Sequence, residues 1–289
     1  MGSRRDDEEK AATAVDAVPL PAASPIKTRR HAGDVHLLSA AFFFLFSAYL
    51  PTQNLQSTLN TDGDMGAVSM GILYVSFTLF AVAASPVVRW LGARLALVVG
   101  TSGYALFILA NLLPTWYTMV PASVYLGFTA AIIWVGKGTY LTSAALSHAR
   151  DNNLPDGPAV GRFNGEFWGV FASTQCTHLC LPYSPMGGLV GAAAPLLIGA
   201  LWGVGNGVLN TQLSALLGLL FEDVKEAAFA QFRVWQSGAM AVIFFLSQVI
   251  TLQAMLILMS TSLVVSFGSF LTLTLVVDKS SSTIRLSGY

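Results

Sequence analysis

The stretch Tyr117–Leu146, YTMVPASVYLGFTAAIIWVGKGTYLTSAAL, decides the fold class of this chain. Its roughly thirty residues carry a single charge, on Lys137. A helix of that length rises roughly 45 Å, which exceeds the roughly 30 Å hydrocarbon core of a bilayer. The stretch is apolar on all faces, as lipid requires, and a helix satisfies its own backbone hydrogen bonds there. It therefore predicts a transmembrane helix in an integral membrane protein.

Composition places the whole chain in the same class. Of its 289 residues 54% are hydrophobic and only 10% are charged, against roughly 25% charged in soluble domains. The mean hydropathy is +0.63. The net charge is zero, whereas phosphate binding needs a surplus of clustered Lys and Arg. The lipid bilayer is therefore an expected partner and nucleic acid is not.

Eight apolar segments follow a polar amino-terminal tail. Residues 1–34 lack helical or strand periodicity and predict a disordered cytoplasmic tail rather than a secretory leader. The predicted spans lie at about residues 37–56, 70–88, 95–113, 117–146, 163–181, 188–221, 234–252 and 255–277, and the fifth is weaker than the others. We expect an amino-terminal membrane bundle of five spans at 35–181, a carboxy-terminal bundle of three spans at 182–277, and a cytoplasmic tail at 278–289.

The connections between the spans predict the orientation, because Lys and Arg in short loops stay in the cytoplasm. With the amino terminus inside, basic residues fall on the cytoplasmic side at Arg89 with Arg94, Arg150 with Arg162, Lys225 with Arg233, and Lys279 with Arg285. The opposite connections, near Asp62, Pro114, Pro182 and Gln253, contain no Lys or Arg. Both termini are therefore expected in the cytoplasm, with the plasma membrane and endomembranes both open.

Several strings resemble the Unc-93-like family, most closely its plant members. They are PTQNLQSTLN at 51–60, SMGILYVSFTLF at 69–80, VRWLGARLAL at 88–97, SGYALFILANLLPTWYTMVPASVYLGF at 102–128, GTYLTSAA at 138–145 and FNGEFWGVFAST at 163–174. The resemblance resumes with LWGVGNGVLNTQLSALLGLLF at 201–221 and AFAQFRVWQSGAMAVIFFLSQ at 228–248, which look like the tenth and eleventh spans of the family. It covers about three quarters of the chain.

The resemblance implies a major facilitator-type fold, with twelve helices in two halves around a central cavity. This chain is too short for twelve, because the region expected to hold spans six to nine is absent after Thr174. Losing four helices leaves the orientation of every later span unchanged. The sequence therefore predicts an all-α multi-pass bundle, an incomplete major facilitator-type fold with about eight spans, as a shortened isoform or an imperfect gene model.

Lys137 is the first candidate site residue. Burying an ionisable group deep in a membrane span costs free energy, and such a group usually faces a cavity or a partner. The family resemblance implies Gln at this position, so Lys137 departs from the pattern of the family. The alternative is a structural role, in which Lys137 snorkels along its helix or pairs with Glu166 near the start of the fifth span.

Amide side chains are the other candidates, because groups that hydrogen-bond in lipid prefer the bundle interior. These amides can line a polar path for a small solute, contact a partner or pack between helices. The candidates are Gln53, Asn54, Gln56, Asn206, Asn210 and Gln212. Glycines repeat every fourth residue at 161, 165 and 169 and at 199, 203 and 207, which predicts close helix packing.

The sequence predicts neither a metal site nor a catalytic nucleophile. Cys176, His178 and Cys180 supply three ligands that point to different sides of a helix, so we predict no metal there. The sequence contains no GxxxxGK[ST], HExxH or GxSxG motif. We therefore expect no catalytic residues, no cofactor and no enzyme.

Two functional classes remain. The resemblance implies a regulator of ion channels, potassium channels in particular, or of ion homeostasis, with an ion-channel subunit as partner. It also implies a major facilitator-type secondary transporter of a small solute. Because the missing helices remove much of a two-halved cavity, the shortened chain favours the regulator or an inactive truncated isoform.

Overall fold

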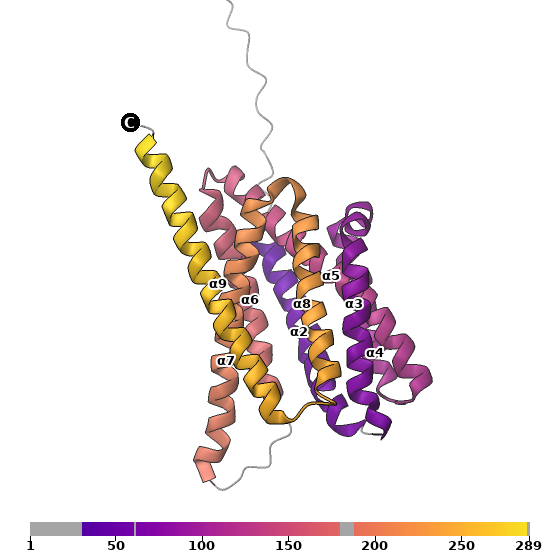
Figure 1. Ribbon diagram of the computed structural model, residues 1–289. Helices are drawn as coiled ribbons and strands as arrows, with labels where there is room; N and C mark the ends of the chain where they lie inside the picture. Colours follow the sequence, from indigo (N-terminus) through magenta and orange to yellow (C-terminus); the bar gives the residue numbers. More distant parts are fainter. Residues whose placement is uncertain (1–30, 61, 180–187, 288–289) are drawn as a thin grey trace, which may run out of the picture. The chain divides into compact units, whose positions relative to one another are not determined.

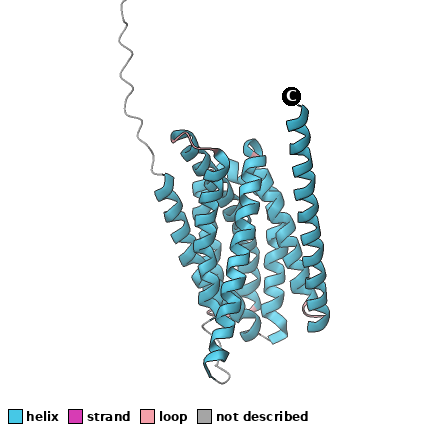
Figure 2. Cartoon of the chain, turned by 90° about the vertical axis from the view of Figure 1, so that its left-hand side faces the viewer, coloured by secondary structure: helices cyan, strands magenta, loops and turns pink. Residues whose placement is uncertain are grey.

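The computed structural model of this chain describes residues 31–60, 62–179 and 188–287, which are helical almost throughout. The long helices of this part are α2 His31–Leu59, α3 Met65–Leu91, α4 Ala93–Ala110, α5 Trp116–Asp151, α6 Asp156–Leu179, α7 Gly188–Leu220, α8 Lys225–Leu246 and α9 Leu252–Ser287. Two short 3-10 helices, η1 Asp62–Asp64 and η2 Glu222–Val224, lie in the connections. Figures 1 and 2 show the long helices running alongside one another.

The predicted class, an all-α membrane bundle, is confirmed. Each predicted span corresponds to one of the long helices. Among the described residues, five segments are long and apolar enough to cross a membrane, namely Gly33–Gln56, Met65–Leu91, Ala93–Ala110, Trp116–Asp151 and Glu222–Leu246. The described residues from His31 onward form one compact unit in which α6 packs on α7 and α3 packs on α8. Helices on both sides of residues 181 and 182, the expected boundary between two bundles, are thus in contact.

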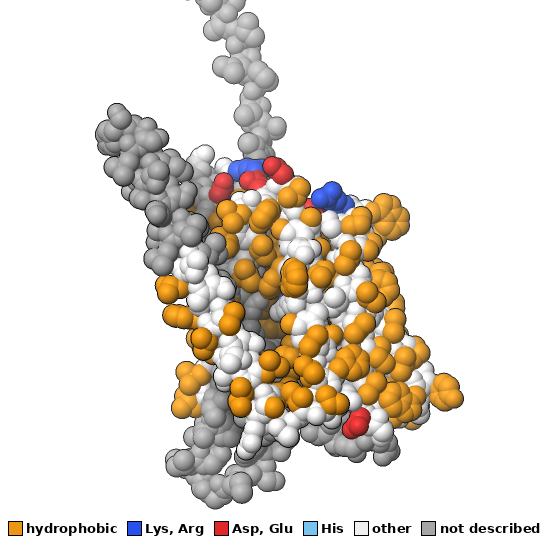
Figure 3. Space-filling model, viewed as in Figure 1, with side chains coloured by type: hydrophobic (Ala, Val, Ile, Leu, Met, Phe, Trp, Pro, Cys, Tyr) orange, Lys and Arg blue, Asp and Glu red, His pale blue; other side chains and the backbone are white. Residues whose placement is uncertain are grey.

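Helix α5 is the centre of the bundle. It packs against α2, α3, α4, α6, α7 and α8, and 72% of its most apolar window is buried, against 28–44% in the other four candidate spans. The apolar character on all its faces therefore reflects burial by other helices, rather than contact with lipid as the sequence suggested. The surrounding helices carry the outward apolar side chains that cover the flank in Figure 3.

Glycines on α4 allow the closest approach to α5. A Cβ atom at Gly103 would lie 1.8 Å from Thr129 Oγ1, and one at Gly100 would lie 2.2 Å from Ile133 Cβ. Both distances are far inside van der Waals contact, so α4 can lie against α5 only because these positions have no side chain.

The two predicted glycine repeats lie on helices that do pack together, α6 and α7. Gly207 makes the close approach, because a Cβ there would lie 3.5 Å from Ala172 Cβ. A Cβ at Gly161 or Gly169 would meet open space. The repeats thus predicted the right helix pair but not which glycines pack.

Several predicted connections differ in position or length. The connection expected near Gln253 lies at residues 247–251, because α8 ends at Leu246 and α9 begins at Leu252. Helix α5 continues to Asp151 and α6 begins at Asp156, so the loop expected between 147 and 162 shrinks to residues 152–155. Pro158 is compatible with this because it lies in the first turn of α6, where its missing N–H is not needed. Helix α8 begins at Lys225 rather than at Val234, so Arg233 belongs to a helix and not to a charged loop.

Charged side chains join several helix ends on one side of the bundle. Arg150 forms an ion pair of 2.6 Å with Glu222, and Arg89 lies 3.8 Å from Glu226. Figure 3 shows charged side chains gathered at one end of the molecule. The connection between the predicted spans 70–88 and 95–113 is a single residue, because only Gly92, with φ of 76°, separates α3 from α4. The Arg150–Glu222 pair contributes at most about 1 kcal/mol, because both of its side chains are largely open to solvent.

Candidate functional site

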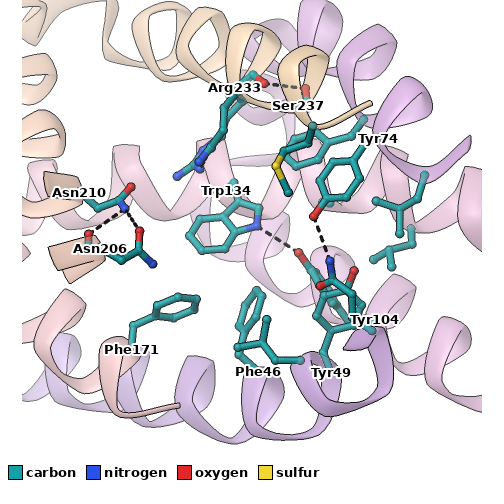
Figure 4. Close-up of a pocket in the computed structure, with 18 of the residues that line it drawn as sticks. Phe46, Tyr49, Tyr74, Tyr104, Trp134, Phe171, Asn206, Asn210, Arg233 and Ser237 are labelled. Atoms are coloured by element: carbon teal, nitrogen blue, oxygen red, sulfur yellow. Dashed lines mark hydrogen bonds between the residues drawn. The ribbon is translucent and has the colours of Figure 1, made fainter. Parts of the chain in front are cut away.

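A cavity of about 270 Å³ lies at the centre of the bundle. Residues from α2 to α8 line it, and Figure 4 shows aromatic side chains on one side and polar groups of α7 and α8 on the other. The polar lining consists of Gln53, Asn206, Asn210, Arg233, Gln236 and Ser237 together with three tyrosines, Tyr49, Tyr74 and Tyr104.

The aromatic wall of the cavity is held by ring contacts and hydrogen bonds. Tyr49 and Tyr104 meet edge to face with centroids 4.8 Å apart, and Phe46 lies 5.1 Å from Tyr104. Trp134 Nε1 donates to the Tyr104 hydroxyl at 3.1 Å. Gln53 Nε2 donates to the Tyr74 hydroxyl at 3.2 Å. Such pairs fix the ring orientations, so the wall has a defined shape.

Arg233 is the charged residue on the described wall. Its side chain, in the middle of α8, is only 4% exposed, and its guanidinium carbon lies 4.4 Å from the ring centroid of Trp134. It donates through Nη1 to Gln236 Oε1, while Nε is buried without a hydrogen-bond partner. No ion pair joins it to a carboxylate of the described residues. Burying an arginine in a membrane costs about 2.5–3.5 kcal/mol, of which a cation–π contact offsets up to about 2.

Lys137 lies behind the aromatic wall rather than on the cavity surface. It is 1% exposed, and its Nζ is 4.2 Å from the Trp168 centroid and 4.3 Å from that of Phe167. The expected pairing with Glu166 is absent, because Glu166 accepts from Arg162 on its own helix at 2.9 Å. Lys137 is thus held by ring faces, which attract a cation through their quadrupole.

The structure brings together three of the predicted amides. Gln53, Asn206 and Asn210 line the cavity, and Asn210 Nδ2 donates to Asn206 Oδ1 at 2.7 Å.

The other amides lie elsewhere. Gln56 is buried and donates to the Gly66 carbonyl at 3.5 Å, which joins α2 to the start of α3. Asn54 and Gln212 are exposed, and Gln212 borders a separate groove between α6 and α7. A polar path through all the predicted residues is therefore not formed.

The sequence analysis did not identify Arg233 as a site residue, because its charge led to its assignment to the connection before the predicted span 234–252. The helical periodicity of this segment would have indicated that Arg233 is buried. On α8 the residues Phe229, Arg233, Ser237 and Ala241 follow at intervals of four and are all buried. Extending the 3.6-residue period backward from the apolar part of α8 places Arg233 on the inward stripe.

The described residues contain no group of three His, Cys, Asp or Glu side chains that could hold a metal ion. Cys180, like the side chains of Cys176 and His178, lies outside the described part of the chain, so the structure does not test the expectation made for that group.

Long apolar helices around a central cavity, with most charges at the helix ends, define a multi-pass helical membrane protein. The profile of the family described as "Ion channel regulatory protein UNC-93" matches residues 59–161 and 188–271. The chain belongs to the UNC-93 family. The resemblance noted from its sequence strings is confirmed.

Individual relatives are similar over different lengths. UNC93-like protein 3 of Arabidopsis thaliana is 33% identical over 422 aligned positions, which cover 90% of this chain and 89% of that protein. Because this chain has only 289 residues, a long internal stretch of the plant relative has no counterpart here. Protein unc-93 homolog A of Bos taurus is 35% identical over 142 residues, 49% of this chain and 31% of that protein.

One relative carries a function in its name. The "Putative potassium channel regulatory protein unc-93" of Caenorhabditis elegans is 35% identical over 141 residues. This match covers 48% of the chain but only 20% of the nematode protein. No solved structure matches the chain.

Proposed function

We propose that this protein regulates an ion channel, and a potassium channel in particular, by binding a channel subunit within the membrane. The family match carries the proposal, because it covers the whole of α3, α4, α5, α7 and α8. The name of the nematode relative supports potassium as the ion. We further propose that both termini lie in the cytoplasm, in accordance with the basic residues at one set of connections.

Helix α9 is the surface we propose for the channel contact. Its described side chains from Ile257 to Thr272 are all exposed, including Leu263, Val264 and Phe267. Most of the helix lies within the part matched by the family profile, which ends at residue 271. Figures 1 and 2 both show α9 at the edge of the bundle. Helices in membranes associate through the packing of such faces, so α9 can pair with a helix of a channel.

The proposal is tested by coexpressing the full chain with each of a panel of potassium-channel subunits. We expect one subunit to copurify and its current to change at least twofold. Replacing Leu263, Val264 and Phe267 together by alanine should reduce copurification at least fivefold. The matched control replaces Leu106 and Leu109, which face outward on α4, and should leave copurification unchanged. Absence of any captured subunit and of any current change would refute channel regulation.

A second candidate function, secondary transport of a small solute, is favoured by the central cavity alone. Two observations weigh against it, namely the internal stretch of the plant relative that is missing here and the lack of a continuous path through the predicted amides. Flux into proteoliposomes separates the two functions. Solute uptake by the purified unmodified chain would support transport and count against a purely regulatory protein.

A further inference from the structure

The central cavity has an unusual charge balance. Arg233 lies on its wall, and none of the described residues that line it is Asp or Glu. A second cation, Lys137, lies within 5.7 Å of the centroid of Trp134, the same ring on which Arg233 stacks. Neither cation is paired with a carboxylate in the described part of the chain. In a site of low dielectric, two cations without a carboxylate partner favour an anion.

We propose that this cavity binds an organic anion, whose carboxylate or phosphate group is held by Arg233. The side chain is 4% exposed and points into the cavity between Trp134 and Asn210 (Figure 4). Its Nε has no partner although it is buried. A guanidinium presents parallel N–H donors that match carboxylate and phosphate oxygens. Asn206, Asn210 and Ser237 offer further polar contacts on the same side.

The remaining walls define the body of the ligand. Apolar side chains, namely Phe46, Phe171, Leu126 and Met240, also line the cavity, so the anion carries an apolar or aromatic part. The volume of about 270 Å³ is close to the lower end of small-molecule sites, about 300 Å³. Two sources share this chemistry, namely a free amphipathic carboxylate and the head group of an anionic lipid with the start of its chains.

The first experiment uses the unmodified full chain in phosphatidylcholine nanodiscs. Isothermal titration measures the binding of 2-naphthoate, its methyl ester and 2-naphthylmethylammonium, which differ chiefly in charge. We expect 2-naphthoate to bind at least tenfold more tightly than either of the others. Equal affinity for the ester or the ammonium ion overturns the proposal, because the cavity would then be merely apolar.

The second experiment tests Arg233. Arg233→Gln should weaken 2-naphthoate binding at least tenfold. Arg233→Lys should bind with intermediate affinity, because lysine keeps the charge but lacks the parallel N–H donors of the guanidinium. The matched control is Arg162→Gln, at an exposed arginine of α6, which should bind as the unmodified chain does. Unchanged affinity in a folded Arg233→Gln variant overturns the proposal. If that variant does not fold, the comparison of the three probes decides.

The third experiment separates the two sources in nanodiscs that contain phosphatidylglycerol. Retention of this lipid in native mass spectra, with loss of 2-naphthoate binding through competition, identifies a lipid head group. Binding of 2-naphthoate that phosphatidylglycerol does not affect identifies a free solute. If neither anion binds, the proposal fails. The site does not depend on the channel contact, so the α9 variants should bind 2-naphthoate normally.

Discussion

Lys137→Glu should prevent folded protein from accumulating, whereas Lys137→Met should raise thermal stability. The native ammonium group lies 4.2–4.3 Å from the ring centroids of Trp168 and Phe167. A carboxylate would face the negative side of both rings at a cost on the order of 3–5 kcal/mol. Attraction by Arg233, which stacks on the neighbouring Trp134 ring, offsets only part of this cost. Methionine fills a similar volume without a buried charge and should add about 1–2 kcal/mol.

The measurement is thermal unfolding in detergent, followed by size-exclusion chromatography of a fluorescent fusion. Arg94→Glu is the control for charge reversal, because Arg94 is exposed at the start of α4. Its effect should stay within about 0.5 kcal/mol. A folded Lys137→Glu variant that melts with the unmodified chain would show that the ring faces do not hold this cation.

Gly103→Leu should abolish the folded bundle, because no space exists for a side chain between α4 and α5. Even a Cβ at this position would lie 1.8 Å from Thr129 Oγ1. Overpacking typically costs about 1–3 kcal/mol, and it exceeds this range where the clash involves packed helices that cannot separate. Gly161→Leu on α6 is the matched control, since a Cβ there meets no atom within 4 Å. It should keep most of the stability of the unmodified chain.

A compensating pair tests whether steric conflict is the cause. Gly103→Ala alone should lower the melting temperature clearly, while Gly103→Ala with Thr129→Gly should recover part of the loss, because the space moves from one helix to the other. The yield of monodisperse protein and the melting temperature are measured for each variant. A Gly103→Leu variant that folds as well as Gly161→Leu would contradict the close approach of α4 to α5.

The architecture could be predicted because hydropathy and length act locally. Each apolar segment long enough to cross a bilayer became a helix, and Pro114, Gly92 and the acidic residues near Glu222 mark real connections. The ends were harder to predict, since a helix can continue where its sequence turns polar. The first turns of α8 are an example, because they carry charges yet bury Phe229 and Arg233.

The candidate site could be predicted only in part, because a cavity depends on contacts between distant segments. The sequence singled out Gln53, Asn206 and Asn210 for polarity, and they do line the cavity. It also singled out Lys137, but burial behind Trp168 and Phe167 follows from how α6 packs on α5, which no local pattern records. The exposed position of Gln212 likewise depends on the rotation of α7 relative to α6.

The most direct test of the whole account is labelling from the lipid phase. The chain is reconstituted in a bilayer that contains an apolar carbene-generating reagent, and labelled residues are mapped by mass spectrometry. We predict label on the outward side chains of α4, namely Leu95, Val98, Leu106 and Leu109, and none on the central part of α5 from Ala130 to Gly138, which is buried. Label along this part of α5, or failure of α4 to react, would contradict a membrane bundle built around α5.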